Sequence, residues 1–474
     1  MKNYKVTLNN TPLTVYDCDV SAIPFNSVWP GHQRPKNQTE KAYFVTMDID
    51  QASELAITVT EDFQDYEIRP LAYDMPRERK GNTVTVTVDK PMQFTFEADG
   101  YHNVLHVFVN AKSEKPAGDN VIYYGKGEHH VGLIWLKSHQ TLYLEEGAVV
   151  HGAIYGKDVE DIRIMGRGIL DSSRYRRHND MPEDGREIYD ALREKIQDEA
   201  YYDTISAGGI YSSIVLYNCK DVLMEGITVK DTMSWGIIVR NHCKNVTIDN
   251  LKIVGQWRYN SDGIDICASQ HVVVKNCFIR AFDDCFVARS AYLNGETEAV
   301  DDVLVENCVM WCDWGKSLEV WCGHRPCVIR NVTFRNNYLI RLSNLAISIT
   351  SWYGSENTLI ENIRYENIFV DADKCYRNLE IESKDHSEYS YSCDFVPSML
   401  VIGATMIGRL SGHQTYEPVD DTSMFHLLYR NISFENVRYN GKPLDAIVEK
   451  QGSVLDIQNV TAKDCDFEIR EISK

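Results

Sequence analysis

Three carboxyl side chains are spaced so that folding could bring them together. Asp262 lies 21 and 22 residues before the adjacent pair Asp283 and Asp284. Carboxyl groups that cluster cannot all ionise freely, so at least one should hold a proton near neutral pH while another stays charged. Hydrolysis of a glycosidic bond needs such an acid and such a base in one place. The same side chains could also bind Ca²⁺ through their oxygens, or lie in solvated turns.

These acids meet only if the chain repeats with a period close to their spacing. A five-residue unit of β-forming residues that ends in Gly or Asn recurs, and its ends fall 24, 26, 31, 24 and 31 residues apart between positions 226 and 362. Such a period is typical of a solenoid, and Asn tolerates the left-handed backbone of a tight bend. The units occupy residues 222–226, 246–250, 272–276, 303–307, 327–331, 358–362, 432–436 and 455–459.

The repeat predicts an all-β chain that forms a right-handed parallel β-helix. An antiparallel sandwich would instead place turn signals about every 8 to 12 residues. In a parallel β-helix, residues one coil apart lie on neighbouring strands about 4.8 Å apart. We therefore expect Asp262, Asp283 and Asp284 to converge on one patch. The adjacent pair should lie in a bend, because in a regular strand one of the two carboxylates would point into the core.

The alternation of polar and apolar residues divides the chain into two parts. Residues 1–115 alternate without the repeat, which predicts an N-terminal β-sandwich. Residues 116–140 are expected to connect this sandwich to the β-helix, which we expect over residues 141–474. This layout places the acids well inside the solenoid.

Two insertions interrupt the repeat, near residues 172–200 and 374–426. The first contains a stretch typical of a helix, with apolar residues at Ile188, Leu192 and Ile196. Long excursions from a rigid scaffold usually shape a binding surface. These insertions could close a groove over the acids or pair the subunits of a homo-oligomer.

The charge and the hydropathy of the chain argue against several classes of partner. The net charge is −20, from 49 basic and 69 acidic residues, which argues against nucleic acid and mildly against a highly anionic polymer. The chain begins without an apolar signal segment, and no run approaches the roughly 18 apolar residues of a membrane helix. We expect no membrane partner and a cytoplasmic location for the chain as given, or secretion if a signal peptide has been removed.

The cysteines recur at strand positions of the repeat. The chain has 13 of them, an odd number, and Cys277, Cys285, Cys308 and Cys327 lie at strand-like positions of the repeat. We expect these to be reduced thiols stacked in the core rather than disulfides.

Two acidic motifs resemble those of a known family. The runs 260–265 and 283–285 resemble the signature of the polygalacturonases, glycoside hydrolase family 28. The resemblance covers roughly residues 140–370, with further matches at 142–152, at 166–171 and from Trp235 to 248. It implies a right-handed β-helix and an inverting hydrolase that needs no metal or other cofactor. Asp283 would then be the general acid, while Asp262 and Asp284 would position and activate the water.

Two family motifs are missing from this chain. The family has Gly-His-Gly in the next coil, where this chain has Lys316 in place of the histidine, and either Lys316 or His324 could replace it. The family also has an Arg-Ile-Lys that holds the carboxylate of the substrate, but residues 345–349 contain neither cation. Without the Arg, the usual partner for a uronate is absent.

These departures predict a neutral substrate. The related dextranase and isopullulanase family is similar in having a β-sandwich before the β-helix and three acids without that histidine or Arg-Lys pair. We therefore expect a neutral, glucan-like oligo- or polysaccharide rather than a galacturonan. A β-helix that binds carbohydrate without cleaving it, or a polysaccharide lyase, is a further alternative. Side chains that we expect to contact the substrate are Lys316, Arg289, Glu319, Trp321, Trp257 and Trp352.

Overall fold

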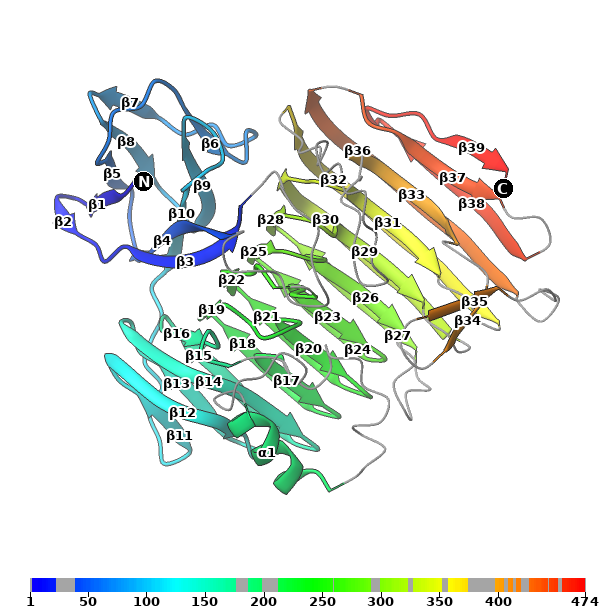
Figure 1. Ribbon diagram of the computed structural model, residues 1–474, viewed down its shortest axis with the longest axis horizontal. Coiled ribbons are helices and arrows are strands. Elements are labelled where there is room, and N and C mark those ends of the chain that lie inside the picture. Colours follow the sequence, from blue (N-terminus) through cyan, green and yellow to red (C-terminus); the bar gives the residue numbers. More distant parts are fainter. Residues whose placement is uncertain are drawn as a thin grey trace.

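The computed structural model contains a β-sandwich that packs beside a long solenoid (Figure 1). It describes residues 2–22, 39–175, 186–197, 212–258, 260–290, 299–322, 327–351, 357–373, 397–404, 408–411, 415–418, 426–441, 443–450 and 454–473.

The N-terminal strands form two five-stranded sheets, ordered β2-β1-β5-β8-β7 and β3-β4-β10-β9-β6. Val6 and Ile57 of the first sheet share one buried core with Phe94 and Val107 of the second, so the two sheets pack face to face. The predicted sandwich is confirmed. Its strands are β1 (Tyr4–Leu8), β2 (Thr11–Pro12), β3 (Tyr16–Ser21), β4 (Thr39–Ile49), β5 (Ser53–Val59), β6 (Tyr66–Arg69), β7 (Arg77–Lys80), β8 (Thr83–Val88), β9 (Met92–Ala98) and β10 (Leu105–Ala111).

The solenoid is one sheet of 27 strands, from β11 to β33 and from β36 to β39. Each strand pairs in parallel with a strand of the next coil, as β18, β21, β24, β27 and β30 do in turn. The predicted right-handed parallel β-helix is confirmed. The domain boundaries stay predictions, and the sheet already includes β11 and β12, which fall within the expected connection 116–140.

The first half of the solenoid consists of β11 (Val121–Tyr124), β12 (Gly127–Trp135), β13 (Thr141–Leu144), β14 (Ala148–Lys157), β15 (Glu160–Gly166), β16 (Ile169–Asp171), β17 (Ile214–Tyr217), β18 (Lys220–Glu225), β19 (Thr228–Lys230), β20 (Ile237–Arg240), β21 (Lys244–Asp249), β22 (Lys252–Val254), β23 (Ile264–Cys267), β24 (Gln270–Lys275) and β25 (Phe278–Ala281). The second half consists of β26 (Phe286–Ser290), β27 (Val300–Glu306), β28 (Val309–Cys312), β29 (Lys316–Cys322), β30 (Cys327–Arg341), β31 (Leu345–Ser351), β32 (Thr358–Ala372), β33 (Ser398–Ala404), β36 (Leu427–Gly441), β37 (Ala446–Lys450), β38 (Leu455–Lys463) and β39 (Arg470–Ser473).

The recurring Asn residues form a ladder along the solenoid. Asn276 and Asn307 adopt left-handed backbone, with φ of 56° and 53°. Their side chains also bond from coil to coil, because Asn307 Nδ2 donates to Asn276 Oδ1 over 2.7 Å, and Asn362 Nδ2 donates to Asn331 Oδ1 over 3.0 Å. The Asn thus accommodates the bend and also links neighbouring coils.

The helix expected in the first insertion is α1 (Arg186–Lys195). Ile188 and Leu192 are buried, as is Ile196 just beyond the helix, and they pack against Tyr155 and Val215 of the solenoid. In the described part of the chain, no helix has the length and apolar character that crossing a membrane requires. Most of the insertion 374–426 lies outside the described residues, but β34 (Gly408–Ser411) and β35 (Thr415–Pro418) form an antiparallel pair within it.

The prediction of reduced cysteines is right for three of the four residues named and wrong for one. Cys277, Cys285 and Cys308 are buried free thiols. Cys327 instead forms a disulfide with Cys322. The two cysteines end β29 and begin β30 on either side of a short connection, which brings their Cα atoms to 6.3 Å, within bonding range.

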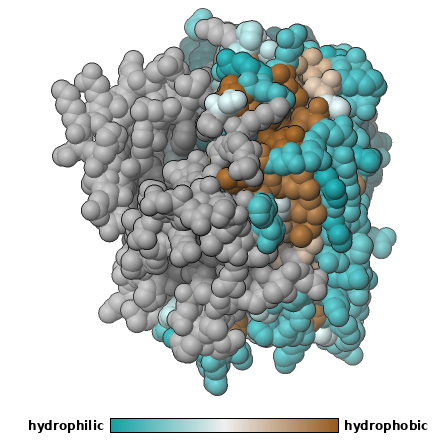
Figure 2. Space-filling model, turned by 90° about the vertical axis from the view of Figure 1, so that its right-hand side faces the viewer, coloured by the Kyte–Doolittle hydropathy of each residue, from teal (hydrophilic) through white to brown (hydrophobic). Residues whose placement is uncertain are grey.

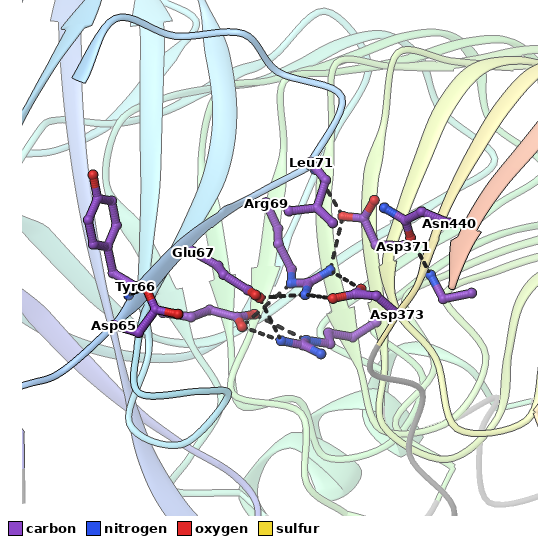
Figure 3. A network of polar contacts seen from close by, with 11 residues as sticks. Asp65, Tyr66, Glu67, Arg69, Leu71, Asp371, Asp373 and Asn440 are labelled. Carbon is purple, nitrogen blue, oxygen red and sulfur yellow. Dashed lines mark hydrogen bonds and ion pairs between the residues drawn. The ribbon is translucent and has the colours of Figure 1, made fainter. Parts of the chain in front are cut away.

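The sandwich and the solenoid share a buried polar network (Figure 3). Arg69 of the sandwich contacts Asp373 through two hydrogen bonds of 2.8 Å, and its Nη1 lies 3.4 Å from Asp371. Arg341 of β30 donates from Nε to Glu97 of β9 over 3.1 Å. Arg69, Glu97 and Arg341 are all fully buried, so the contact between the two parts of the chain includes charges removed from water.

The end of the solenoid at β37 to β39 carries apolar side chains between polar ones (Figure 2). Within the described residues, β37, β38 and β39 are the last strands of the large sheet. Leu455 and Phe467 are still buried, and Phe467 packs edge to face on Phe434 with ring centroids 5.8 Å apart. Phe467 therefore covers part of the core at this end.

Candidate active site

Three stacked strands of the solenoid, β23, β26 and β29, position the acids and Lys316. Asp262 precedes β23, Asp283 and Asp284 precede β26, and Lys316 begins β29. The coils are in contact here, since the amide of Gly263 donates to the carbonyl of Asp284 over 2.7 Å. The three acids therefore lie on neighbouring coils, in the arrangement that the repeat predicts, and the adjacent pair lies in a bend before its strand.

Gly315 leaves room for the adjacent acids. A Cβ atom at this position would lie 2.5 Å from Asp284 Oδ1 and 2.6 Å from Asp283 Oδ1, so any larger residue would displace both carboxyl groups. Exposure distinguishes the acids, because Asp283 is 6% exposed while Asp284 is 3% and Asp262 1% exposed. Asp283 is therefore the acid of this cluster most open to a substrate.

Arg289 lies at the centre of the cluster. Its guanidinium donates to Asp262 Oδ2 over 3.3 Å and lies 3.2 Å from Asp265 Oδ1 and 3.9 Å from Asp284 Oδ2. The same group lies over the rings of Trp235 and Trp321, at 4.2 and 4.9 Å from their centroids. The charge of Arg289 therefore attracts Asp262, Asp265 and Asp284. The two indole rings fix the position of the guanidinium.

Lys316 and Glu319 occupy the next coil. The ammonium of Lys316 lies 3.4 Å from Asp284 Oδ1 and 3.3 Å from Glu319 Oε1. The backbone amide of Lys316 also donates to Asp284 Oδ1 over 2.8 Å. Ser348 of β31 donates to Glu319 Oε1 over 3.1 Å. Asp284 is thus bound by a cation and by an amide of the same residue.

These surroundings move the pKa values of the carboxyl groups apart. Burial raises the pKa of Asp262 well above its ordinary value, and the charges of Asp265, Asp283 and Asp284 add to this effect. Burial also raises the pKa of Asp265 to about 7, against the opposing charge of Arg289. The surroundings of Asp262 and Asp265 therefore favour the protonated form of each carboxyl group.

Asp284 and Glu319 show the same separation. Burial alone would raise the pKa of Asp284, but Lys316, a hydrogen bond from Glu319 and Arg289 outweigh burial and lower it. Burial and the charge of Asp284 raise the pKa of Glu319 to about 8. The cluster therefore combines carboxyl groups whose pKa values are raised with Asp284, whose pKa is lowered, as acid–base catalysis requires.

The other expected contact residues differ in position. Trp321 and Glu319 lie on β29 beside Arg289 and Lys316, respectively. Trp257 is buried and lies against Arg258, whose guanidinium is 4.9 Å from the ring centroid. Trp352 and His324 lie outside the described residues. In the described part of the chain, no group of three or more His, Cys, Asp or Glu side chains could hold a metal ion.

Asp265 and Trp235 join the cluster although we did not predict a role for either of them. Ile264 and Ile266 point into the core of the solenoid, so Asp265 between them must point to the outer face of β23. In register, Asp265 pairs with Val287, which pairs with Glu319. This alternation is visible in the sequence and could have identified Asp265, whereas no sequence signal pairs Trp235 with Arg289.

Replacing Lys316 by Met tests how Asp284 is kept ionised. Loss of the ammonium should raise the pKa of Asp284, because burial and the remaining carboxylates then act with less opposition. If the ionised form of Asp284 is needed for reaction, the acid limb of the pH profile of kcat/KM should move to higher pH. Activity should therefore fall more at acid than at neutral pH.

Lys316→Arg is the matched control, because it retains the positive charge. The backbone amide that binds Asp284 is present in both variants. A profile that moves equally in both variants would show that the shape of the side chain, and not its charge, governs the ionisation of Asp284.

Comparison with known proteins shows sequence similarity to glycoside hydrolases. Residues 209–384 match the model of glycosyl hydrolases family 28. A probable polygalacturonase from Arabidopsis thaliana is 31% identical over 164 residues, which cover 30% of this chain and 36% of that protein. A dextranase from an Arthrobacter species is 24% identical over 286 residues, which cover 54% of this chain and 40% of that protein. The match therefore spans less than half the length of these relatives.

A solved structure shares the fold over nearly the whole chain. Dex49A from Penicillium minioluteum aligns with a TM-score of 0.57 at 12% sequence identity, covering 97% of this chain and 94% of that chain. This likeness extends over both the sandwich and the solenoid, and at this identity it concerns the fold alone. The chain thus shares sequence similarity with polygalacturonases and dextranases over part of its length, and it shares the fold of Dex49A over nearly all of it.

Proposed function

We propose that the protein is an inverting glycoside hydrolase that cleaves a neutral, glucan-like oligo- or polysaccharide. The observation that carries the proposal is the meeting of Asp262, Asp283 and Asp284 on neighbouring coils, with Asp283 the most exposed of the three and the pKa of Asp284 lowered by Lys316 and Arg289. Carboxyl groups that cluster in this way can supply both the acid and the base of a hydrolytic site. The similarity to polygalacturonases and dextranases supports the same chemistry.

In this proposal each acid has a separate role. Asp283, the most exposed of the three, protonates the glycosidic oxygen as the bond from that oxygen to the anomeric carbon breaks. Asp262 and Asp284 hold a water molecule, which attacks the anomeric carbon and passes its proton to Asp284. Inversion follows if the water attacks from the face opposite the leaving oxygen.

The inverting outcome is proposed from the resemblance rather than from the spacing of the carboxyl groups. Inverting glycosidases usually separate their two carboxyl groups by ~6.5–9.5 Å, and retaining ones by ~5–5.5 Å. The carboxyl groups of Asp283 and Asp284 both border the space where a Cβ atom of residue 315 would lie, so they are close together. The anomeric configuration of the first product distinguishes inversion from retention.

The charges around the acids support a neutral substrate. Arg289 and Lys316 both lie against carboxyl groups of the protein, so neither is left for the carboxylate of a uronate. In the next coil, Ser348 and Thr350 pair in register with Glu319 and Trp321 and offer hydroxyl groups instead of cations. A galacturonan-type substrate remains the alternative, because several relatives are polygalacturonases.

A panel of glycans tests the proposed activity. We expect products from dextran or pullulan but not from polygalacturonate, measured by chromatography of the reaction mixtures. NMR of the first product should show the anomeric configuration opposite to that of the substrate. Products from polygalacturonate alone would favour the alternative substrate, and binding of glycans without any product would favour a non-catalytic role.

A further inference from the structure

A groove lies where the sandwich meets the solenoid. It has a volume of about 1050 Å³. Tyr73, Met92 and Gln93 line it from the sandwich, and Arg167 and Tyr338 line it from the solenoid. Ligand sites of this size occur preferentially at such junctions between structural units.

This groove is separate from the acid cluster. Its solenoid wall includes Met165 of β15, Glu225 of β18 and Asp249 of β21, with the Asn bends that follow β21, β24 and β27. The acids instead precede β23 and β26, which belong to a different row of stacked strands. A ligand in the groove therefore meets a different face of the solenoid.

The groove is elongated along the axis of the solenoid. Its wall takes residues from six consecutive coils. Met165, Glu225 and Asp249 lie on β15, β18 and β21, which pair in turn. The next three coils contribute Asn276 after β24, Asn307 after β27 and Tyr338 on β30. With neighbouring strands about 4.8 Å apart, six coils span about 24 Å. This length fits a chain of several linked units better than a single small molecule.

The lining combines aromatic rings with polar groups. Tyr73 and Tyr338 meet edge to face, with centroids 5.1 Å apart, and Tyr338 stacks on Phe369 at 5.4 Å. Gln93 is 5% exposed, and its Oε1 has no hydrogen-bond partner within the described part of the chain. Rings that offer a flat apolar surface and amides that exchange hydrogen bonds are the groups that bind sugars and their hydroxyls.

The charges of the groove argue against an anionic ligand. Carboxyl side chains outnumber basic ones among the lining residues. Arg167 is already bound, since its Nε donates to Asp48 over 2.8 Å and its Nη1 to Glu225 over 3.0 Å. A phosphate or a uronate would therefore meet a net negative wall, whereas a neutral sugar would not.

We propose that this groove is a second binding site, which holds a segment of a neutral polysaccharide away from the acid cluster. The choice of a neutral glucan as ligand rests on the proposed function. A polymer bound in the groove is held on the same molecule as the acid cluster, which raises its effective concentration there although the groove takes no part in the chemistry.

Binding of soluble dextran and pullulan tests this site. We use the Asp283→Asn variant, so that the polymer stays intact, and measure retardation by affinity electrophoresis. Adding Tyr338→Ala should weaken polymer binding about tenfold, the effect expected when one aromatic contact of about 1.4 kcal/mol is lost. Ser113→Trp, which fills the groove from a connecting segment, should have the same effect if Tyr338→Ala fails to fold.

Tyr123→Ala is the matched control, because Tyr123 is an exposed tyrosine that does not line the groove. It should leave binding unchanged. Polymer binding that persists in both folded groove variants, or that is absent from the parent, would overturn the proposal. A failure of the proposed function gives a different result. In that case the unmodified protein does not hydrolyse the glycans, but polymer binding can still be measured by electrophoresis.

In the hydrolytically active protein, KM should show the same difference. For the polymer, KM should rise in Tyr338→Ala, while kcat and the KM of a short oligosaccharide stay unchanged. A rise for both substrates would show that the variant disturbs the acid cluster and would contradict the assignment.

Discussion

Replacing Asp283 by Asn should lower kcat by about 10²- to 10⁴-fold, the usual contribution of a positioned general acid or base. The amide has the size of the carboxyl group but cannot protonate the leaving oxygen. Because Asp283 sits in a bend beside Gly315 and is nearly buried, an isosteric change should preserve the packing. The measurement is the initial rate of hydrolysis on the best glycan of the panel.

A matched control exists in the same chain. Asp302 also belongs to an adjacent acid pair, but it is an exposed residue that contacts His271, so Asp302→Asn should leave the rate unchanged. Rates reduced equally by both variants would point to a general loss of folded protein. An unchanged rate in Asp283→Asn would contradict the role of Asp283 as the acid.

The leaving group separates the acid from the base. An aryl glycoside whose phenolate is a good leaving group needs little protonation, so it should recover much of the rate lost in Asp283→Asn. Asp284→Asn should gain nothing from such a substrate, because its defect lies in activating the water. A recovery in Asp284→Asn alone would exchange the two roles.

The second large effect concerns stability. Replacing Glu97 by Gln should lower the free energy of unfolding by about 3–5 kcal/mol, because the change removes the buried carboxylate that Arg341 contacts. Arg69 loses the same partner, since its Nε lies 3.5 Å from Glu97. Two buried guanidinium groups would then keep their cost of leaving water with less compensation. Urea unfolding followed by circular dichroism measures the change.

An exposed ion pair gives the control for this experiment. Glu435 and Lys463 lie 2.6 Å apart, with side chains 53% and 71% exposed, so Glu435→Gln should change stability by no more than about 1 kcal/mol. A similarly small effect of Glu97→Gln would show that water or relaxation compensates the buried arginines. A separate early unfolding transition in Glu97→Gln would show that the sandwich detaches before the solenoid unfolds.

The sequence predicts the fold well because the relevant signal is local and repeated. Each coil contains its own β-forming unit and its own Asn bend, so the period alone predicts the stacking of Asp262 beside Asp283 and Asp284. The position of α1 follows from local apolar spacing in the same way. Such features need no knowledge of distant contacts.

The remaining features depend on side chains whose contacts the period does not specify. Arg289 lies between Trp235 and Trp321 only because three coils present their outer faces together. The disulfide of Cys322 and Cys327 depends on how tightly two strands are connected. The groove between Tyr73 and Tyr338 depends on how the sandwich packs, which no repeat in the sequence describes.

The Asn ladder links coils that follow one another at a constant spacing. The acid cluster draws on a few adjacent coils, whereas the groove extends over six coils on another face. Gaining or losing one coil outside the cluster would therefore leave every distance among the acids unchanged. It would nevertheless change the separation between the cluster and the far end of the groove by about 4.8 Å. Relatives with different numbers of coils could thus retain the same hydrolytic site while binding polymers of different length.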